Sequence, residues 1–255
     1  MKEGYYKMIK ISVVSYLNSK PFIYGFNKTK FNSFAEIELD IPSVCAEKLL
    51  NGKVDIGLVP VAILPELKNY SIISDYCIGA NGPVDSVLLL SNEPLESVKT
   101  ILLDYQSRTS VLLSRVLAKK FWNISPEFLP SEPGYENDIS GSVAGVVIGD
   151  RALILKNKFK YCYDLAGEWK KFTGLPFVFA TWTAITPPDD AFMLEFNSAL
   201  GEGMKLIREI SKNESSHELS ENVIFNYLTK SIDFNFDKDK KSALELFLRY
   251  ASELK

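Results

Sequence analysis

The sequence predicts an α/β protein of two lobes, and three observations lead to this prediction. Short apolar runs alternate with amphipathic segments almost to residue 185, a pattern typical of parallel sheets covered by helices. The alternation comes in two sets, the second of which starts near residue 98, so each set predicts a sheet of its own. From Asp189 onward the pattern is helical, and we expect this tail to pack on the first lobe.

The first set predicts five strands, each an apolar run bounded by turn residues. They are expected over Ile9–Ser15, Ala35–Ile41, Val54–Pro60, Ser71–Ala80 and Val84–Leu90. Pro21 suits the first turn of a helix after the first strand, because that position needs no intrahelical partner for its N–H. Gly52 supplies the left-handed residue that ends the next helix.

The second set predicts four strands, and its clearest helix runs from Arg108 to about Phe121. The strands are expected over Thr100–Leu103, Ala144–Ile148, Tyr161–Leu165 and Phe177–Thr183. The helices of the tail are expected near 189–211, 215–229 and 239–253.

We expect the chain to cross between the lobes near Leu89–Glu93 and Trp182–Thr186. The first lobe then comprises residues 8–91 and 184–255, and the second comprises residues 92–183. A ligand cleft is expected between them. This arrangement is that of type II periplasmic-binding-protein folds.

Composition restricts the class of partner. Apolar residues make up 46% of the 255 residues and charged residues 24%, which is ordinary for a globular protein. A net charge of -3 offers no basic surface for nucleic acid or an anionic membrane. The first residues lack the features of a signal peptide, and no apolar run reaches the roughly 20 residues that span a bilayer. The three cysteines form no CxxC pair, so we expect reduced thiols and a cytoplasmic location.

Small polar residues gather where predicted strands end, which is where open α/β sheets bind ligands. The sharpest of these segments is Asp104–Ser110, because it combines hydroxyl groups, one guanidinium and the free N–H groups of a helix start. Ser107, Arg108, Thr109 and Ser110 are therefore candidates for holding a carboxylate or phosphate. The alternative is that Ser107 only caps the helix.

Three further segments of this kind contain Asn18, Ser86 and the pair Gly149 and Asp150. Asn18 can instead hold a turn, and Ser86 can be an ordinary strand residue. The single histidine, His217, lies in a polar stretch between helices, so a histidine-based triad is not expected. There is no phosphate-binding glycine loop, dinucleotide motif or zinc-ligand spacing, and we predict neither a metal nor a cofactor.

Six blocks of the sequence, in order, resemble the chorismate dehydratase family of the futalosine route to menaquinone. They are SYLNSKP at Ser15–Pro21, VDIGLVPV at Val54–Val61, GPVDSV at Gly82–Val87, DYQSRTS at Asp104–Ser110, IGDRAL at Ile148–Leu153 and TGLPFVFA at Thr173–Ala180. The resemblance implies a type II periplasmic-binding-protein fold, with Asn18 and Ser86 as catalytic residues and the 107–110 loop in the ligand cleft. Asp85 departs from the family, which commonly has a small residue there; in a strand it points away from Ser86.

The resemblance further implies dehydration of chorismate, a dicarboxylate, to 3-[(1-carboxyvinyl)oxy]benzoate without a cofactor. Two groups are candidates for the base that removes the C3 proton. One is an enzyme carboxylate, Asp104 or Asp150, and the other is the enolpyruvyl carboxylate of the substrate, held by Asn18 and Ser86. The competing functions are 1,4-dihydroxy-6-naphthoate synthase of the same pathway and a non-catalytic solute-binding protein.

Overall fold

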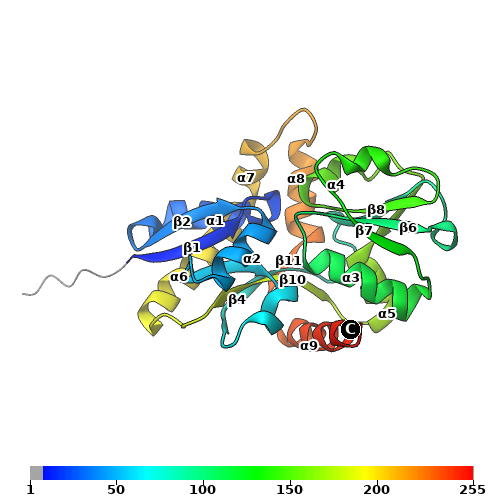
Figure 1. Cartoon of the computed structure of the whole chain (residues 1–255). Coiled ribbons are helices and arrows are strands. Elements are labelled where there is room, and N and C mark those ends of the chain that lie inside the picture. The colour runs from blue at the N-terminus through cyan, green and yellow to red at the C-terminus, as the bar shows by residue number, and fades with distance from the viewer. Residues whose placement is uncertain (1–7, 255) are drawn as a thin grey trace, which may run out of the picture.

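The computed structural model describes residues 8–254 and contains two mixed sheets, each covered by helices (Figure 1). The first sheet has six strands in the order β11-β4-β10-β3-β1-β2 and the second has five in the order β7-β6-β8-β5-β9. We call each sheet with its helices a lobe. The first sheet consists of β1 (Ile9–Val14), β2 (Ala35–Asp40), β3 (Ile56–Pro60), β4 (Ser71–Ala80), β10 (Phe177–Ala184) and β11 (Asp233–Asn235). The second consists of β5 (Val87–Ser91), β6 (Thr100–Leu103), β7 (Glu127–Pro130), β8 (Val143–Ile148) and β9 (Tyr161–Asp164).

The two-lobed α/β class is confirmed, but the sheets are mixed where parallel sheets were expected. In the first sheet β1 pairs in parallel with β2 and β3, whereas β10 runs antiparallel to β3 and β4. In the second sheet β6 pairs in parallel with β7 and β8, whereas β5 runs antiparallel to β8 and β9. Each of β5 and β10 is the strand by which the chain enters the opposite lobe.

The two crossings between the lobes lie earlier than the sequence predicted. The first falls at residues 81–86, between β4 and β5, and the second at residues 174–176, before β10. The strand over Val87–Ser91 therefore belongs to the second sheet, and that over Phe177–Ala184 belongs to the first. Every residue of both strands is buried, so their apolar patterns do not indicate which of the two sheets each strand joins.

Helices flank both sheets. They are α1 (Lys20–Lys28), α2 (Pro42–Leu50), α3 (Thr109–Leu117), α4 (Gly149–Leu155), α5 (Leu165–Thr173), α6 (Asp190–Lys205), α7 (Ile207–Asn213), α8 (Glu221–Asn226) and α9 (Lys238–Ser252). Helix α6 packs so closely on α1 that a Cβ added at Gly203 would lie 1.7 Å from the carbonyl oxygen of Pro21. No helix in the described part of the chain is long and apolar enough to cross a membrane.

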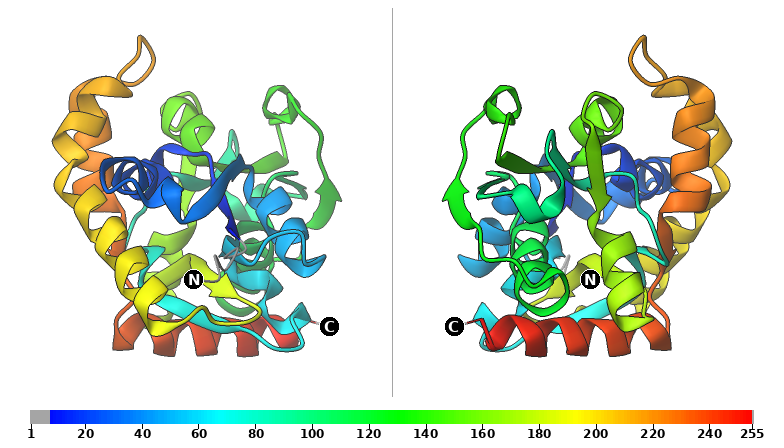
Figure 2. Two further views of the ribbon diagram at one scale, coloured as in Figure 1. Left: turned by 90° about the vertical axis from the view of Figure 1, so that its left-hand side faces the viewer. Right: turned by 90° about the vertical axis from the view of Figure 1, so that its right-hand side faces the viewer.

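The helical tail covers more than the first lobe. Helix α9 lies along the bottom of the molecule (Figure 2), and its Phe247 contacts Phe177 of the first sheet as well as Trp169 of α5. Helix α8 stands between the lobes (Figure 1) and continues into a π-helical turn over Tyr227–Ser231. The tail therefore joins the lobes, whereas the sequence predicted a cover for the first lobe alone.

Candidate functional site

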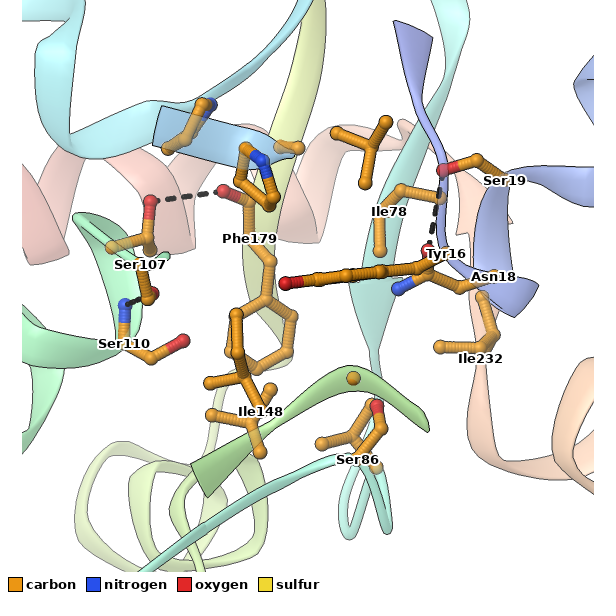
Figure 3. Close-up of a pocket in the computed structure, with 18 residues that line it drawn as sticks. Tyr16, Asn18, Ser19, Ile78, Ser86, Ser107, Ser110, Ile148, Phe179 and Ile232 are labelled. Carbon is orange, nitrogen blue, oxygen red and sulfur yellow. Dashed lines mark hydrogen bonds between the residues drawn. The ribbon is translucent and has the colours of Figure 1, made fainter. Parts of the chain in front are cut away.

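A pocket lies between the two lobes, where the chain leaves β1 and β8, beside the first crossing and strand β10 (Figure 3). It contains about 530 Å³ of space not filled by protein atoms, including its opening to solvent. The pocket is lined by Val14, Tyr16, Asn18, Ser19, Pro42, Pro60, Ile78, Val84, Ser86, Val87, Ser107, Thr109, Ser110, Ile148, Gly149, Phe179, Ala180 and Ile232. The sequence predicted eight catalytic or substrate-binding residues. Six of them line the pocket, and the two that do not are Arg108 and Asp150.

Asn18 and Ser86 reach this pocket from different parts of the chain. Asn18 precedes α1 on the short turn after β1, and its Oδ1 accepts a hydrogen bond from the Ser19 hydroxyl at 3.2 Å. Ser86 ends the first crossing; its carbonyl accepts from the Gly149 N–H at 2.8 Å and its Oγ from the Tyr227 hydroxyl at 2.8 Å. The Asn18 side chain also interacts with the Tyr227 hydroxyl. The structure therefore brings the two predicted catalytic residues to one buried tyrosine.

The 107–110 loop supplies hydroxyl groups at the start of α3. The Ser107 hydroxyl accepts the Ser110 N–H at 3.0 Å, so it caps the helix as well as lining the pocket. The Thr109 hydroxyl donates to the Phe179 carbonyl at 3.0 Å and accepts the Ala62 N–H at 3.3 Å, which leaves it no proton for a ligand. Ser110 lines the pocket with its hydroxyl at the first turn of α3, where the helix dipole favours an anion.

Arg108 and Asp150 do not line the pocket. The Arg108 guanidinium lies 3.6 Å from the Glu66 carboxylate, in a pair whose side chains are 38% and 56% exposed. The Asp150 carboxylate accepts the Leu17 N–H at 3.2 Å, a contact between the lobes, and lines a separate groove beside α8. Burial raises the pKa of Asp150, and the Leu17 N–H opposes that shift. Neither residue lines the pocket, although the adjacent residues Ser107, Thr109 and Gly149 do.

Tyr16 is the lining residue that sequence reasoning missed. Its ring extends into the pocket (Figure 3), and its hydroxyl donates to Gln106 Oε1 of the second lobe. Burial, followed by the nearby Asp104 charge, raises the pKa of the Tyr16 phenol, so it remains protonated in neutral solution. The sequence could have indicated this role, because Tyr16 lies two residues before Asn18 in the first block that resembles the family.

A buried ionic network lies behind the pocket in the second lobe. The Asp104 side chain is 0% exposed, and it accepts hydrogen bonds from Arg151 at 2.6 Å and from the Tyr135 hydroxyl at 2.9 Å. Burial raises the pKa of the Asp104 carboxyl, although the Arg151 guanidinium opposes that shift. Arg151 also pairs with Glu136 and lies 3.4 Å from Gln106 Oε1. The network therefore supports Tyr16 through Gln106.

Among the described residues, the lining of the pocket contains no Asp, Glu, His, Lys, Arg or Cys side chain. Its polar groups are the hydroxyls of Tyr16 and of serine and threonine side chains, with the Asn18 amide and backbone N–H groups. His217, the single histidine, is exposed in the loop between α7 and α8. Such a lining can orient and hydrogen-bond a bound anion, but it offers no side chain that is an effective base at neutral pH.

The two mixed sheets and the pocket between them place the chain in the periplasmic-binding-protein-like class. A protein from Archaeoglobus fulgidus has a TM-score of 0.75 and 15% identity, covering 96% of this chain and 97% of its own. A Candida albicans protein described as having the generic periplasmic binding protein fold has a TM-score of 0.64 and 14% identity, covering 97% and 90%. The alkanesulfonate-binding protein of Xanthomonas axonopodis, bound to MOPS, has a TM-score of 0.60 and 16% identity, covering 96% and 93%.

Within this class the chain belongs to the menaquinone biosynthesis family, which matches residues 9–253. A chorismate dehydratase from Thermus thermophilus is 28% identical over 195 residues, which cover 69% of this chain and 71% of the relative. The resemblance found in the sequence blocks is thereby confirmed at the level of family and fold.

Proposed function

We propose that the protein dehydrates chorismate to 3-[(1-carboxyvinyl)oxy]benzoate as a cofactor-independent carbon–oxygen lyase. The relationship to the Thermus thermophilus chorismate dehydratase supports the substrate, and membership of the menaquinone biosynthesis family supports the pathway. The observation that carries the mechanism is the composition of the pocket: hydroxyl and amide groups line it, and no ionisable carboxylate, imidazole or amine of the described residues does.

This lining favours the substrate's enolpyruvyl carboxylate as the base. Asp104 is fully buried and bonded to Arg151 and Tyr135, so it has no access to a ligand. Asp150 faces the groove beside α8 and is bonded to the Leu17 backbone. The two enzymic candidates for the base are therefore disfavoured, and a carboxylate carried into the pocket by the substrate takes their place.

In the proposed reaction the enolpyruvyl carboxylate takes the proton from C3, and the C4–O bond breaks as the ring becomes aromatic. The C3 hydrogen and the C4 hydroxyl lie on one face of the ring, so the same carboxyl group returns the proton to the departing hydroxyl and water leaves. Asn18 and Ser86 hold the enolpyruvyl carboxylate and the departing hydroxyl, and Ser107 and Ser110 with the N-terminus of α3 hold the ring carboxylate. Aromatisation supplies the driving force, so orientation and charge placement are the protein's contribution.

Incubation of the purified protein with chorismate alone tests the function. We expect an aromatic product lighter than chorismate by one water. Chorismate that is bound but unchanged would favour the solute-binding alternative. Turnover of chorismate would exclude a protein devoted only to the later naphthoate synthase step.

Alanine variants test the roles of the two polar residues. We expect Asn18→Ala and Ser86→Ala to lower kcat by about 100-fold or more while calorimetry still detects chorismate binding. Asn222→Ala and Ser242→Ala, at exposed positions of α8 and α9, are matched controls. Near-normal turnover in both pocket variants would sink the assignment. A large loss of kcat in Asp104→Ala or Asp150→Ala with binding intact would instead favour an enzymic base.

The state of the cysteines supports a cytoplasmic location, which we also propose. Cys45, Cys77 and Cys162 are all free, and the first two are buried. Burial raises the pKa of the Cys45 thiol to about 12, so this sulfur is protonated and unreactive at neutral pH.

A further inference from the structure

Tyr227 in the helical tail contacts the proposed catalytic residue Ser86 from behind the pocket. It begins the π-helical turn after α8 and is 3% exposed. Its hydroxyl donates to Ser86 Oγ at 2.8 Å, although the two residues are 141 positions apart in the chain. The same hydroxyl interacts with the Asn18 side chain. Tyr227 does not line the pocket, so its connection to a ligand runs through these two residues.

The direction of this hydrogen bond restricts where the Ser86 proton can point. A serine hydroxyl has one hydrogen and two acceptor positions. Because Ser86 Oγ accepts from Tyr227, its own hydrogen lies away from the phenol. Among the described residues no acceptor for that hydrogen is found, and Ser86 borders the pocket. Burial raises the pKa of the Tyr227 phenol, so the donor stays protonated.

A second contact from the tail holds the residue beside Ser86. Asp85 has a left-handed backbone, with φ 66°, and its carboxylate accepts from the Ser231 hydroxyl at 2.9 Å and from Lys156 at 3.1 Å. Asp85 therefore points away from the pocket, as expected from the sequence, although through a turn and not through strand alternation. The tail thus fixes the crossing at two neighbouring residues, only one of which borders the pocket.

We propose that Tyr227 is a positioning residue for the dehydration: by donating to Ser86 Oγ, it directs the Ser86 hydrogen into the pocket. This inference rests on the proposed function, since it assigns Tyr227 to the same reaction. The oriented Ser86 hydrogen meets the departing C4 hydroxyl or the enolpyruvyl carboxylate without reorganisation during the reaction. Tyr227 itself exchanges no proton with the substrate.

The test compares Tyr227→Phe with Ser231→Ala. Tyr227→Phe keeps the ring and removes only the hydroxyl, so the chain is expected to fold, and thermal unfolding verifies this. Ser231→Ala removes the other hydrogen bond from the tail to the same crossing without altering Ser86. We expect Tyr227→Phe to lower kcat about tenfold with KM changed by less than about threefold, because one orienting hydrogen bond is lost while the carboxylate contacts at α3 remain. Ser231→Ala is expected to keep both constants within about twofold.

Three results would overturn the inference. One is a Tyr227→Phe enzyme with wild-type kcat, and another is an equal fall of kcat in Ser231→Ala, which would mean that the tail only stiffens the crossing. The third is a wild-type protein that makes no aromatic product from chorismate; this would remove the proposed function together with the inference. Because wild-type turnover is measured first, failure of the inference alone is distinguishable from failure of the function.

Discussion

The ring of Tyr16 packs directly against the backbone of Gly149, across the boundary between the two lobes. A Cβ on Gly149 would lie 3.0 Å from both Cδ2 and Cε2 of the tyrosine ring. Gly149 also has φ 65°, in the left-handed region that favours glycine. The contact brings a residue that follows β1 against the first residue of α4 and closes one wall of the pocket.

Gly149→Ala is therefore expected to lower both stability and catalytic efficiency. The added methyl group combines backbone strain with a clash on a ring that is held in place by its hydroxyl contact to Gln106. Gly174→Ala is the matched control, because Gly174 has φ 74° but no atom within 4 Å of the place that a methyl group would take. We expect both variants to lose about 1 kcal/mol in urea unfolding from strain alone. Only Gly149→Ala should also raise KM for chorismate, and equal kinetics in the two variants would contradict this expectation.

Asp150 predicts a dependence of stability on pH. Burial raises its pKa in the folded protein, so the folded state binds the proton more readily than the unfolded chain does. The free energy of unfolding should therefore fall as pH rises from about 4 through the folded pKa. Asp150→Asn keeps an oxygen that can accept the Leu17 N–H and removes the buried charge. We expect it to be more stable than wild type at pH 7 by roughly 1 kcal/mol and to show a shallower slope.

Urea unfolding across this pH range measures the effect of Asp150→Asn. Asp138→Asn, at an exposed position in the second lobe, is the control for removal of a carboxylate as such. A slope that is the same in Asp150→Asn and wild type would show that Asp150 is not a source of the dependence.

The buried pair of Asp104 and Arg151 predicts a large loss of stability when one partner is removed. Arg151→Met leaves the fully buried Asp104 carboxylate without its counter-charge, which costs about 3 kcal/mol. Lys156→Met removes a cation from an exposed pair with Asp85, whose side chains are 33% and 42% exposed, and should cost at most about 1 kcal/mol. Chemical denaturation of both variants gives the comparison. Similar losses in the free energy of unfolding would mean that the burial of Asp104 does not make its ion pair more stabilising than an exposed one.

The sequence predicted local structure and the loops of the site better than it predicted long-range connections. Apolar runs located β4 and β6 at their observed bounds, and the ordered blocks brought Asn18, Ser86 and Ser110 to one pocket. Local patterns cannot show how a distant segment returns. Tyr227 lies in a tail without a recognisable motif, and its role depends on a contact 141 positions away.

The sheet assignments failed for a related reason. The strands β5 and β10 are buried along their full length, so neither periodicity nor polarity distinguishes one sheet from the other. Arg108 was misplaced because it precedes the first turn of α3, where a difference of one residue changes the direction of a long side chain. Its guanidinium extends toward Glu66 at the surface, while its neighbours Ser107 and Thr109 face the pocket.

The hydrogen bond from Tyr16 to Gln106 predicts how readily the lobes close. It joins the loop after β1 to the loop after β6, so its loss should favour an open form of the ligand-free protein. One such bond contributes about 1 kcal/mol, which corresponds to roughly a fivefold rise in KM when the closed form becomes less populated. Tyr16→Phe should therefore raise KM by about this factor, and small-angle scattering should show a larger radius of gyration that saturating chorismate reduces.

Tyr105→Phe is the matched control for this closure. The Tyr105 hydroxyl accepts from Gln106 Nε2 at 2.9 Å, so the variant removes another hydrogen bond of the same glutamine, but one that lies wholly within the second lobe. We expect its radius of gyration without ligand to equal that of the wild type. An enlarged Tyr105→Phe protein would mean that Gln106 needs both partners to keep its place. A compact Tyr16→Phe protein with raised KM would assign Tyr16 to direct contact with chorismate, since closure would then not depend on its hydroxyl.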